Sequence, residues 1–321
     1  MARNDDVRGV QNDNGGIKDG CNDTLPQEKP MRSKVKIPAK INLTLDIVGA
    51  ENGFHKLKSL VTSANIFDVV TLLKRKDDKI TVRFTGLSAG VPGEASHAKK
   101  AALAFTGSFS VRGADITIKR NIPAGGGLGG SSADVAGVLL GMKKLYLREI
   151  IARTGLTERE IDGKIEKIAN SLGSDTAYML RGGYAVLSGR GEIIDRCLAE
   201  LKLYFLIIAG TDGVSSAAAY KKYDEIGKKY PPHTTEAARA YFAGETKELA
   251  ELLKNDLYPA ASEILPEIKN SLGKLEKFGA ASMTGSGSAV FGLYENKKER
   301  DFAYKILKRE YGKRLIKAET I

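Results

Sequence analysis

Cysteine is scarce in this chain, whose 321 residues include only Cys21 and Cys197. Two distant cysteines provide neither a disulfide framework nor the spacing of a metal site, so a reducing compartment such as the cytoplasm is expected. Long apolar runs are also missing. The most apolar stretch, residues 204–210, is far shorter than the roughly 18 residues that a membrane-spanning helix needs. We therefore expect a soluble protein.

The beginning of the chain lacks the features of a targeting segment and of a folded domain. Residues 1–16 are polar, have no apolar core region and are too acidic for an organelle transit peptide, so no export is expected. Residues 1–30 are rich in Asn, Asp and Gly and have no periodic apolar positions. We predict a disordered or non-native extension there.

Acidic residues are outnumbered by basic ones, 39 against 50, which gives a formal net charge of +11. Such a charge suits anionic partners, either nucleic acid or phosphorylated small molecules. Composition does not choose between these classes, and a solvated basic surface without a special partner would have the same composition.

The hydrophobic pattern predicts an α+β protein in two halves, divided near residue 183, without internal repeats. Strands are predicted at 34–49, 68–75, 79–86, 114–121, 182–192 and 201–210. In the third and fourth of these, apolar and polar residues alternate, which favours an antiparallel sheet covered on one side. In the first, the alternation is that of a half-buried strand and places Lys40 and Asn42 on one face.

Helices are predicted where apolar residues recur at a period of 3.6. One follows the glycines of 125–130. A second begins at the capping box formed by Thr157 and Glu160 and ends at Gly173. Further helices are predicted at 215–226, 246–254, 264–277 and 298–309, and a glycine-linked strand pair at 279–294.

The most distinctive segment is IPAGGGLGGSSADVAG, residues 122–137. Gly125, Gly127 and Gly130 formally satisfy the G-x-G-x-x-G pattern of dinucleotide sites. The preceding strand alternates polar and apolar residues, however, whereas a central strand of a doubly wound sheet is almost continuously apolar. No G-x-x-x-x-G-K-[ST] occurs, so a Walker P-loop is excluded. Glycines at the start of a helix instead predict an anion site made of main-chain N–H groups.

Two serines stand at the start of the helix that follows these glycines. Ser131 and Ser132 can cap the helix, and they can also offer hydroxyls to a phosphate or to its Mg²⁺. An ordinary flexible loop with a serine cap would have the same pattern.

Three segments, in order, resemble the motifs of the GHMP kinase family. Residues 123–133 are similar to its phosphate loop, P-x-x-x-G-L-G-[SG]-[SG]-[SA], with Ser131 at the place of a commoner glycine. PAKINL at 38–43 and the glycine turn at 283–294 resemble two further motifs. The resemblance implies an α+β fold of two domains. They are an ATP-binding, ribosomal-protein-like βαβ domain over 31–183 and a C-terminal α/β domain with an antiparallel sheet over 184–321.

The resemblance also implies phosphoryl transfer from ATP, with Mg²⁺, to a substrate hydroxyl, a reaction that depends on positioning and charge neutralisation. Asp175 matches the family's catalytic aspartate, which takes the proton of the attacking hydroxyl, and Lys40 matches the lysine that pairs with it. Without the resemblance, Asp175 would be interpreted as the N-cap of the next helix and Lys40 as a solvent-facing strand residue.

The predicted phosphate-binding residues come from both glycine segments. In the second segment, main-chain N–H groups would approach the phosphates, although a plain hairpin would have the same glycines. Ser132 is the predicted metal contact, through a phosphate-bound Mg²⁺. The predicted phosphate-binding residues are Pro123, Gly125, Gly126, Gly127, Leu128, Gly129, Gly130, Ser131, Ser132, Gly285, Ser286 and Gly287.

Within the family the chain resembles most the members that phosphorylate the 2-hydroxyl of 4-diphosphocytidyl-2-C-methyl-D-erythritol in the non-mevalonate isoprenoid pathway. The segments that carry this likeness are PAKINL, NGFHKL, GGGLGGSSADVAG, LGSD and GVSSAAAYKKYD. The likeness implies that Phe54, in place of a commoner tyrosine, stacks on cytosine and that His55 helps to recognise the base. Tyr220 is a candidate second aromatic wall and Asn42 a further substrate contact. A surface histidine and a core tyrosine are the alternatives for His55 and Tyr220.

Two other functions remain open. A homoserine or mevalonate kinase of the same family would not need the pair Phe54 and His55 or a cytosine pocket. A non-catalytic RNA-binding protein is permitted by the charge and by the ribosomal-protein-like fold. The sequence has no interleaved basic and aromatic residues of the usual kind, however, and the Lys40 and Asp175 matches would then have no role.

Overall fold

The computed structural model describes residues 31–321 except 88–92, 94–95 and 198–200. These residues belong to one compact unit. The extension predicted at 1–30 lies outside the described residues. Among the residues that are described, no helix combines the length and the apolar character that crossing a membrane requires.

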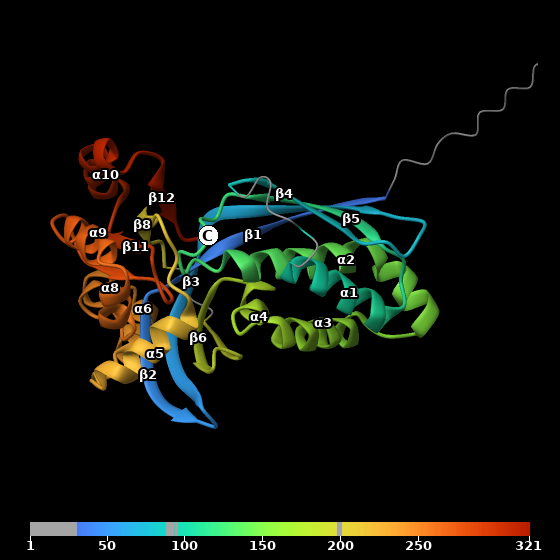
Figure 1. Ribbon diagram of the computed structural model, residues 1–321, viewed down its shortest axis with the longest axis horizontal. Helices are drawn as coiled ribbons and strands as arrows, with labels where there is room; N and C mark the ends of the chain where they lie inside the picture. Colours follow the sequence, from blue (N-terminus) through green and yellow to red (C-terminus); the bar gives the residue numbers. More distant parts are fainter. Residues whose placement is uncertain (1–30, 88–92, 94–95, 198–200) are drawn as a thin grey trace, which may run out of the picture. The chain divides into compact units, whose positions relative to one another are not determined.

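The larger sheet has eight strands in the described part of the chain and is built around one very long strand (Figure 1). Its strands are β1 (Arg32–Asn42), β2 (Thr44–Glu51), β3 (Phe54–Lys74), β4 (Thr81–Gly86), β5 (Ala114–Arg120), β6 (Tyr184–Gly189), β7 (Ile193–Cys197) and β9 (Lys254–Asn255). The second half of β3 pairs with β1 and β5, and its first half pairs with β2 and β6, all antiparallel. This strand therefore connects two parts of the protein.

The antiparallel sheet that the alternation favoured is present where β5 pairs with β3, but β4 pairs with β5 in parallel. The helix α1 (His97–Phe109), which the sequence pattern did not reveal, lies between them in the chain. Parallel neighbours need such a crossover connection, because a tight hairpin can join only antiparallel strands.

The strand expected at 34–49 is divided into β1 and β2 at Leu43. Its polar residues are not half-solvated, as the alternation suggested, because Lys40, Asn42 and Asp46 are all nearly fully buried. Both faces of this part of the sheet are covered by other segments of the chain.

The hairpin between β2 and β3 turns at Asn52 and Gly53, whose φ angles are 52° and 76°. Two consecutive left-handed residues are typical of the type I′ turn, for which Asn-Gly is the favoured sequence. The turn places Phe54 opposite Glu51 and His55 opposite Ala50, at the beginning of β3.

Helices α1, α2 (Gly130–Thr154), α3 (Glu158–Leu172) and α4 (Thr176–Met179) form a layer on one face of the larger sheet (Figure 1). The predicted capping box at the start of α3 is confirmed. Helix α2 packs very closely on β3, because a Cβ atom at Gly137 would lie only 2.4 Å from Val70 Cγ2. These contacts fix the direction of α2, whose first turn faces the site described below.

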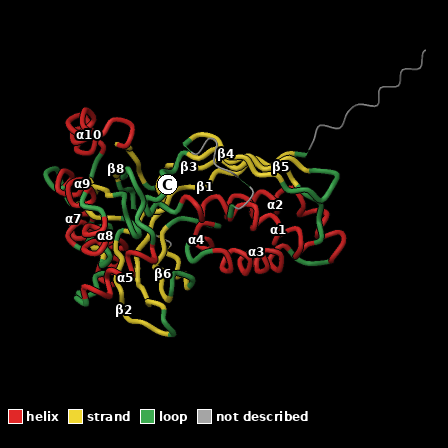
Figure 2. Tube along the Cα trace, viewed as in Figure 1, coloured by secondary structure: helices red, strands yellow, loops and turns green. Residues whose placement is uncertain are grey.

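The smaller sheet has the order β10 (Ala281–Met283), β11 (Val290–Tyr294), β8 (Tyr204–Ile208) and β12 (Leu315–Glu319), all antiparallel. The helices of this part are α5 (Ser216–Ile226), α6 (Thr234–Ala243), α7 (Thr246–Glu251), α8 (Tyr258–Ile264), α9 (Glu267–Leu275) and α10 (Lys297–Tyr311), followed by a 3-10 turn at Gly312–Arg314. Figure 2 shows helices α7 to α10 gathered beside these strands.

Most helices and strands predicted after residue 183 are confirmed, although their first and last residues differ from the predicted ones. They include the strand pair β10 and β11. The pattern missed the helices α6 and α8 and the strands β7, β9 and β12. Strands β6 and β7 follow residue 183 but pair within the larger sheet. The domain boundary at 183 stays a prediction.

Candidate active site

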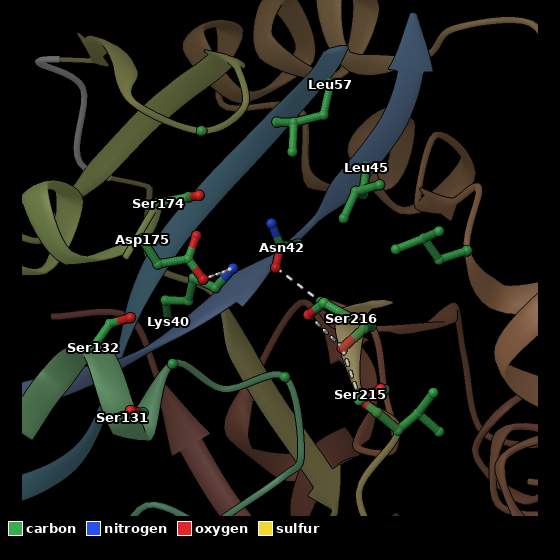
Figure 3. A pocket seen from close by; sticks show the side chains of 18 of the residues that line it. Lys40, Asn42, Leu45, Leu57, Ser131, Ser132, Ser174, Asp175, Ser215 and Ser216 are labelled. Carbon is green, nitrogen blue, oxygen red and sulfur yellow. Dashed lines mark hydrogen bonds and ion pairs between the residues drawn. The ribbon is translucent and has the colours of Figure 1, made fainter. Parts of the chain in front are cut away.

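A cavity of about 470 Å³ lies where the first turn of α2, the end of β1, the start of α4 and the start of α5 meet (Figure 3). It brings together residues from segments that are far apart in the sequence. The predicted site residues that line it are Lys40, Asn42, Gly125, Gly127, Gly129, Gly130, Ser131, Ser132, Asp175, Tyr220, Gly285, Ser286 and Gly287.

An ion pair joins Lys40 and Asp175 at this cavity. Lys40 Nζ lies 2.9 Å from Asp175 Oδ2, and the two side chains are 6% and 33% exposed. Figure 3 shows the pair directed toward the same space as the serines of α2. A buried ammonium group is costly without a partner, so the carboxylate is held next to it.

The alternative interpretation of Asp175 holds in position only: Asp175 is the N-cap residue of α4, yet its side chain makes no capping hydrogen bond to that helix. The alternative interpretation of Lys40 was wrong. Lys40 does not face solvent, because the glycine loop covers it: its main-chain N–H donates to the carbonyl of Leu128 over 3.0 Å. The pairing of Lys40 with Asp175, which the resemblance implied, is present.

The glycine loop has alternating left-handed residues. Gly125, Gly127 and Gly129 have φ angles of 69°, 71° and 79°, and such angles favour glycine strongly. A Cβ atom at Gly127 would lie only 2.1 Å from the carbonyl oxygen of Thr284. The loop therefore needs glycine both for its backbone angles and for its contact with the second glycine segment.

The N-terminus of α2 begins directly after this loop, with Gly129 as its N-cap. No side chain caps the helix, so the expected capping by Ser131 or Ser132 was wrong. The first intrahelical hydrogen bond is donated by Ala133 to Gly129, and the preceding N–H groups have no acceptor within a helix. Three such donors and the helix dipole converge at the cavity, an arrangement suited to an anion.

The second glycine segment, residues 283–294, is hydrogen-bonded to the glycine loop before α2. The N–H groups of Ser288 and Ala289 donate to the carbonyls of Gly125 and Gly126, each over 3.2 Å. The N–H of Gly285 donates to Asn42 Oδ1 over 3.1 Å. Gly285 and its neighbours line the cavity, but several of their N–H groups are already bonded within the protein. Their approach to phosphates stays a prediction.

Asn42 is more constrained than the sequence suggested. Besides accepting from Gly285, it donates from Nδ2 to Ser59 Oγ over 2.7 Å, and its main-chain N–H donates to Thr284 Oγ1 over 3.0 Å. This side chain therefore ties β1 to the second glycine segment while it lines the cavity.

Three predicted phosphate-binding residues, Pro123, Gly126 and Leu128, do not line the main cavity. They line a smaller one of about 100 Å³ at the same loop, together with Arg120. Leu128 is buried. These three residues therefore belong to the glycine loop without lining the main cavity.

Beneath the loop lie two buried carboxyl groups that the sequence analysis missed. Asp68 Oδ1 accepts the N–H groups of Asn121 and Ile122, over 2.6 and 2.9 Å, just before the loop begins. Asp134 of α2 pairs with Arg120. Burial raises the pKa of Asp134 to about 6 despite this partner. Asp68 of β3 thus holds the two residues just before the glycine loop, and Asp134 connects the helix after the loop to Arg120 before it.

An aromatic cluster lies at one side of the cavity. Tyr220 of α5 lines the cavity, and the ring of His55 stacks on it with centroids 4.7 Å apart and planes 15° from parallel. His55 Nε2 lies 2.7 Å from Asp224 Oδ1. Burial, together with the negative charge of Asp175, raises the pKa of Tyr220 to about 12, so the phenol stays protonated at neutral pH.

Phe54 and His55 are not among the cavity-lining residues. Phe54 is 51% exposed, and the guanidinium carbon of Arg190 lies 3.9 Å from its ring centroid. Arg190 does line the cavity, as do Ser174, Ser215 and Ser216, which the sequence analysis missed. Only the glycines that flank Arg190 mark it in the sequence.

Two family models match this chain. Residues 96–183 match the one described as GHMP kinases N terminal domain, and residues 236–313 match GHMP kinases C terminal. A 4-diphosphocytidyl-2-C-methyl-D-erythritol kinase of Desulfitobacterium hafniense is 34% identical over 271 residues, which cover 82% of this chain and 87% of that protein. The enzyme of the same name from Caldanaerobacter subterraneus is 33% identical over 288 residues, covering 88% and 94%.

Solved structures agree with these relatives. A crystal structure of 4-(cytidine 5'-diphospho)-2C-methyl-D-erythritol kinase matches with a TM-score of 0.70 and 26% identity, covering 89% of this chain and 98% of that one. Homoserine kinase from Cytophaga hutchinsonii matches with a TM-score of 0.65 at 17% identity, covering 87% and 90%, and shows the fold alone. The chain has the GHMP kinase fold, belongs to the GHMP kinase family and is an ATP-dependent kinase.

Proposed function

We propose that this kinase transfers the γ-phosphoryl group of ATP to the 2-hydroxyl of 4-diphosphocytidyl-2-C-methyl-D-erythritol. The observation that carries the proposal is the Lys40–Asp175 ion pair. It lies in one cavity with the open N-terminus of α2 and with Tyr220, on which His55 stacks. The names of the relatives that are 33–34% identical over most of their length support the same substrate.

The N-terminus of α2 is the proposed binding place of the ATP phosphates. Its first N–H groups and the dipole of a 25-residue helix favour negative charge. The described residues contain no group of three or more His, Cys, Asp or Glu side chains arranged to hold a metal ion. We therefore propose that Mg²⁺ is held mainly by phosphate oxygens and water, with the Ser132 hydroxyl as the protein contact.

Asp175 is the proposed base. As the hydroxyl oxygen attacks the γ-phosphorus, the bond from that phosphorus to the β–γ bridging oxygen breaks and ADP leaves, while the proton of the hydroxyl passes to the Asp175 carboxylate. Lys40 holds that carboxylate in place through the 2.9 Å ion pair. The lysine also brings positive charge to a site where phosphate charge shifts during transfer.

The aromatic cluster is the proposed cytosine site. His55 and Tyr220 form a rigid stacked pair, and Phe54 precedes His55 at the start of the same strand. Aromatic faces bind a flat base through stacking. A homoserine or mevalonate kinase would have no use for this cluster.

A direct assay distinguishes the candidate functions. Purified protein is incubated with ATP, Mg²⁺ and, in separate reactions, the diphosphocytidyl alcohol, mevalonate and homoserine, and the phosphorylated product is measured by mass spectrometry. We expect product only with the diphosphocytidyl alcohol. Turnover of mevalonate or homoserine would contradict the proposed substrate.

Replacing His55 by alanine tests the cytosine site. Loss of the ring removes the stacking partner of Tyr220 and the contact with Asp224. We expect KM for the diphosphocytidyl alcohol to rise roughly tenfold, while KM for ATP stays unchanged. Steady-state kinetics with each substrate varied in turn measures both constants.

The matched control is His97→Ala. His97 lies at the other side of the site, where its Nδ1 is 3.4 Å from Ser131 Oγ, so this variant should leave KM for the diphosphocytidyl alcohol unchanged. A rise of the ATP KM alone in His55→Ala would refute the assignment.

A further inference from the structure

Arg190 is a cation of the main cavity that the proposed mechanism does not use. It lies in the turn between β6 and β7, between Gly189 and Gly191, whose φ angles are 72° and 110°. The main-chain N–H of Arg190 donates to Glu192 Oε2 over 2.7 Å. This hydrogen bond and the two glycine conformations define the turn that places Arg190 at the cavity.

The turn lies against the segment that carries the proposed base. A Cβ atom placed on Gly191 would be 3.5 Å from Ser174 Cβ and 4.0 Å from Asp175 Oδ1. On its other side, the guanidinium of Arg190 covers the ring of Phe54 at 3.9 Å. Arg190 is therefore located between the proposed base and the aromatic cluster.

The guanidinium of Arg190 has no carboxylate partner within ion-pair distance among the residues that the structure describes. The other two cations at these cavities differ in this respect, since Lys40 pairs with Asp175 and Arg120 pairs with Asp134. A planar fork of N–H donors without a counter-ion, on the wall of a cavity, favours a phosphate ligand.

We propose that Arg190 binds the diphosphate group of the acceptor substrate. The inference rests on the proposed function, because that substrate carries its base and its reacting alcohol at the two ends of a diphosphate. With the base at the aromatic cluster and the hydroxyl at Asp175, the diphosphate passes between them, where Arg190 lies. Arg190 is thus a determinant of substrate specificity, and the proton still passes to Asp175.

The stacking of Arg190 on Phe54 connects the two parts of this recognition. A base that stacks on the same face of Phe54 displaces the guanidinium, which then needs a new partner. The diphosphate attached to the base supplies that partner through charge-assisted hydrogen bonds. Base and diphosphate should therefore bind more tightly together than their separate affinities suggest.

Calorimetric titration of the full-length protein with cytidine, CDP and ATP tests this proposal without relying on turnover. In the variant Arg190→Gln we expect the affinity for CDP to fall at least about tenfold, with that for cytidine and ATP changed less than about twofold. Arg190→Lys should recover part of the CDP affinity, because lysine keeps the positive charge but lacks the planar, bidentate N–H donors of the guanidinium. With the diphosphocytidyl alcohol, KM should rise while kcat at saturation is largely retained.

The control variant is Arg159→Gln, which removes one exposed arginine from the first turn of α3, outside the cavity. It should leave all three affinities unchanged. Equal losses for cytidine and CDP in Arg190→Gln would show that Arg190 only supports the Phe54 ring. A loss confined to ATP would assign it to the donor nucleotide, and unchanged affinities would remove it from binding. Each of these results overturns the proposal.

The two proposals can fail separately. If the wild-type protein binds CDP through Arg190 but does not phosphorylate the diphosphocytidyl alcohol, the proposed function is wrong and a different cytidine diphosphate ligand is indicated. If it phosphorylates that alcohol and Arg190→Gln leaves both CDP binding and KM intact, the inference about Arg190 is wrong while the function stands.

Discussion

Replacing Asp175 by asparagine is expected to lower kcat on the order of a hundredfold or more, with the fold and the ATP affinity retained. The amide has the shape of the carboxylate but cannot take the proton of the attacking hydroxyl. It also leaves the ammonium group of Lys40, whose side chain is only 6% exposed, without its counter-ion. Single-turnover kinetics isolates the chemical step, and calorimetry with ATP measures the binding.

The matched control for this variant is Asp162→Asn. Asp162 also pairs with a lysine, Lys143, with 2.6 Å between Oδ1 and Nζ, but it lies on α3 and not at the cavity. Asp162→Asn should leave kcat unchanged. If Asp175→Asn turned over at the wild-type rate, Asp175 would not be the base. If it unfolded at a much lower temperature, the ion pair would be structural.

Replacing Gly127 by alanine is expected to disrupt the phosphate site, raising KM for ATP by at least about tenfold and lowering the melting temperature. The left-handed φ of 71° alone costs a residue with a Cβ roughly 1–2 kcal/mol. The added Cβ would also lie 2.1 Å from the carbonyl oxygen of Thr284, so the loop and the second glycine segment must move apart. ATP kinetics and thermal unfolding measure the two effects.

Gly163→Ala is the control for this substitution. Gly163 lies inside α3, has no positive φ, and an added Cβ would meet nothing within 4 Å. Alanine there should stabilise the protein by about 0.5–1 kcal/mol and leave ATP kinetics unchanged. A Gly127→Ala variant with normal ATP kinetics would show that the loop tolerates the displacement and does not set the phosphate geometry.

Local signals account for the parts of the fold that the sequence predicted well. The capping box of Thr157 and Glu160, the Asn52-Gly53 turn and the glycines before α2 each act within a few residues, so they can be interpreted without knowing the rest of the structure. The parallel pairing of β4 with β5 depends on α1, and the helical pattern of α1 was not recognised. Strand direction therefore could not be predicted.

The residues of the active site also differ in how far the sequence alone could predict their positions. The family motifs indicated Lys40 and Asp175, but alternation in a strand says only that Lys40 and Asn42 share a face. Whether that face is solvated depends on the glycine loop and on Thr284, which is 242 residues from Asn42. Arg190 gave no signal beyond its glycine neighbours, because its place beside Phe54 and Asp175 results from the pairing of β6 with β3.

The hydrogen bonds from Ser288 and Ala289 to Gly125 and Gly126 affect the order in which the kinase matures during synthesis. The loop before α2 is synthesised first, and the turn that supports it follows 163 residues later in the chain. Contacts of such long sequence separation form late and slowly. The glycine loop of a nascent chain therefore lacks these two hydrogen bonds until Ser288 and Ala289 have been synthesised.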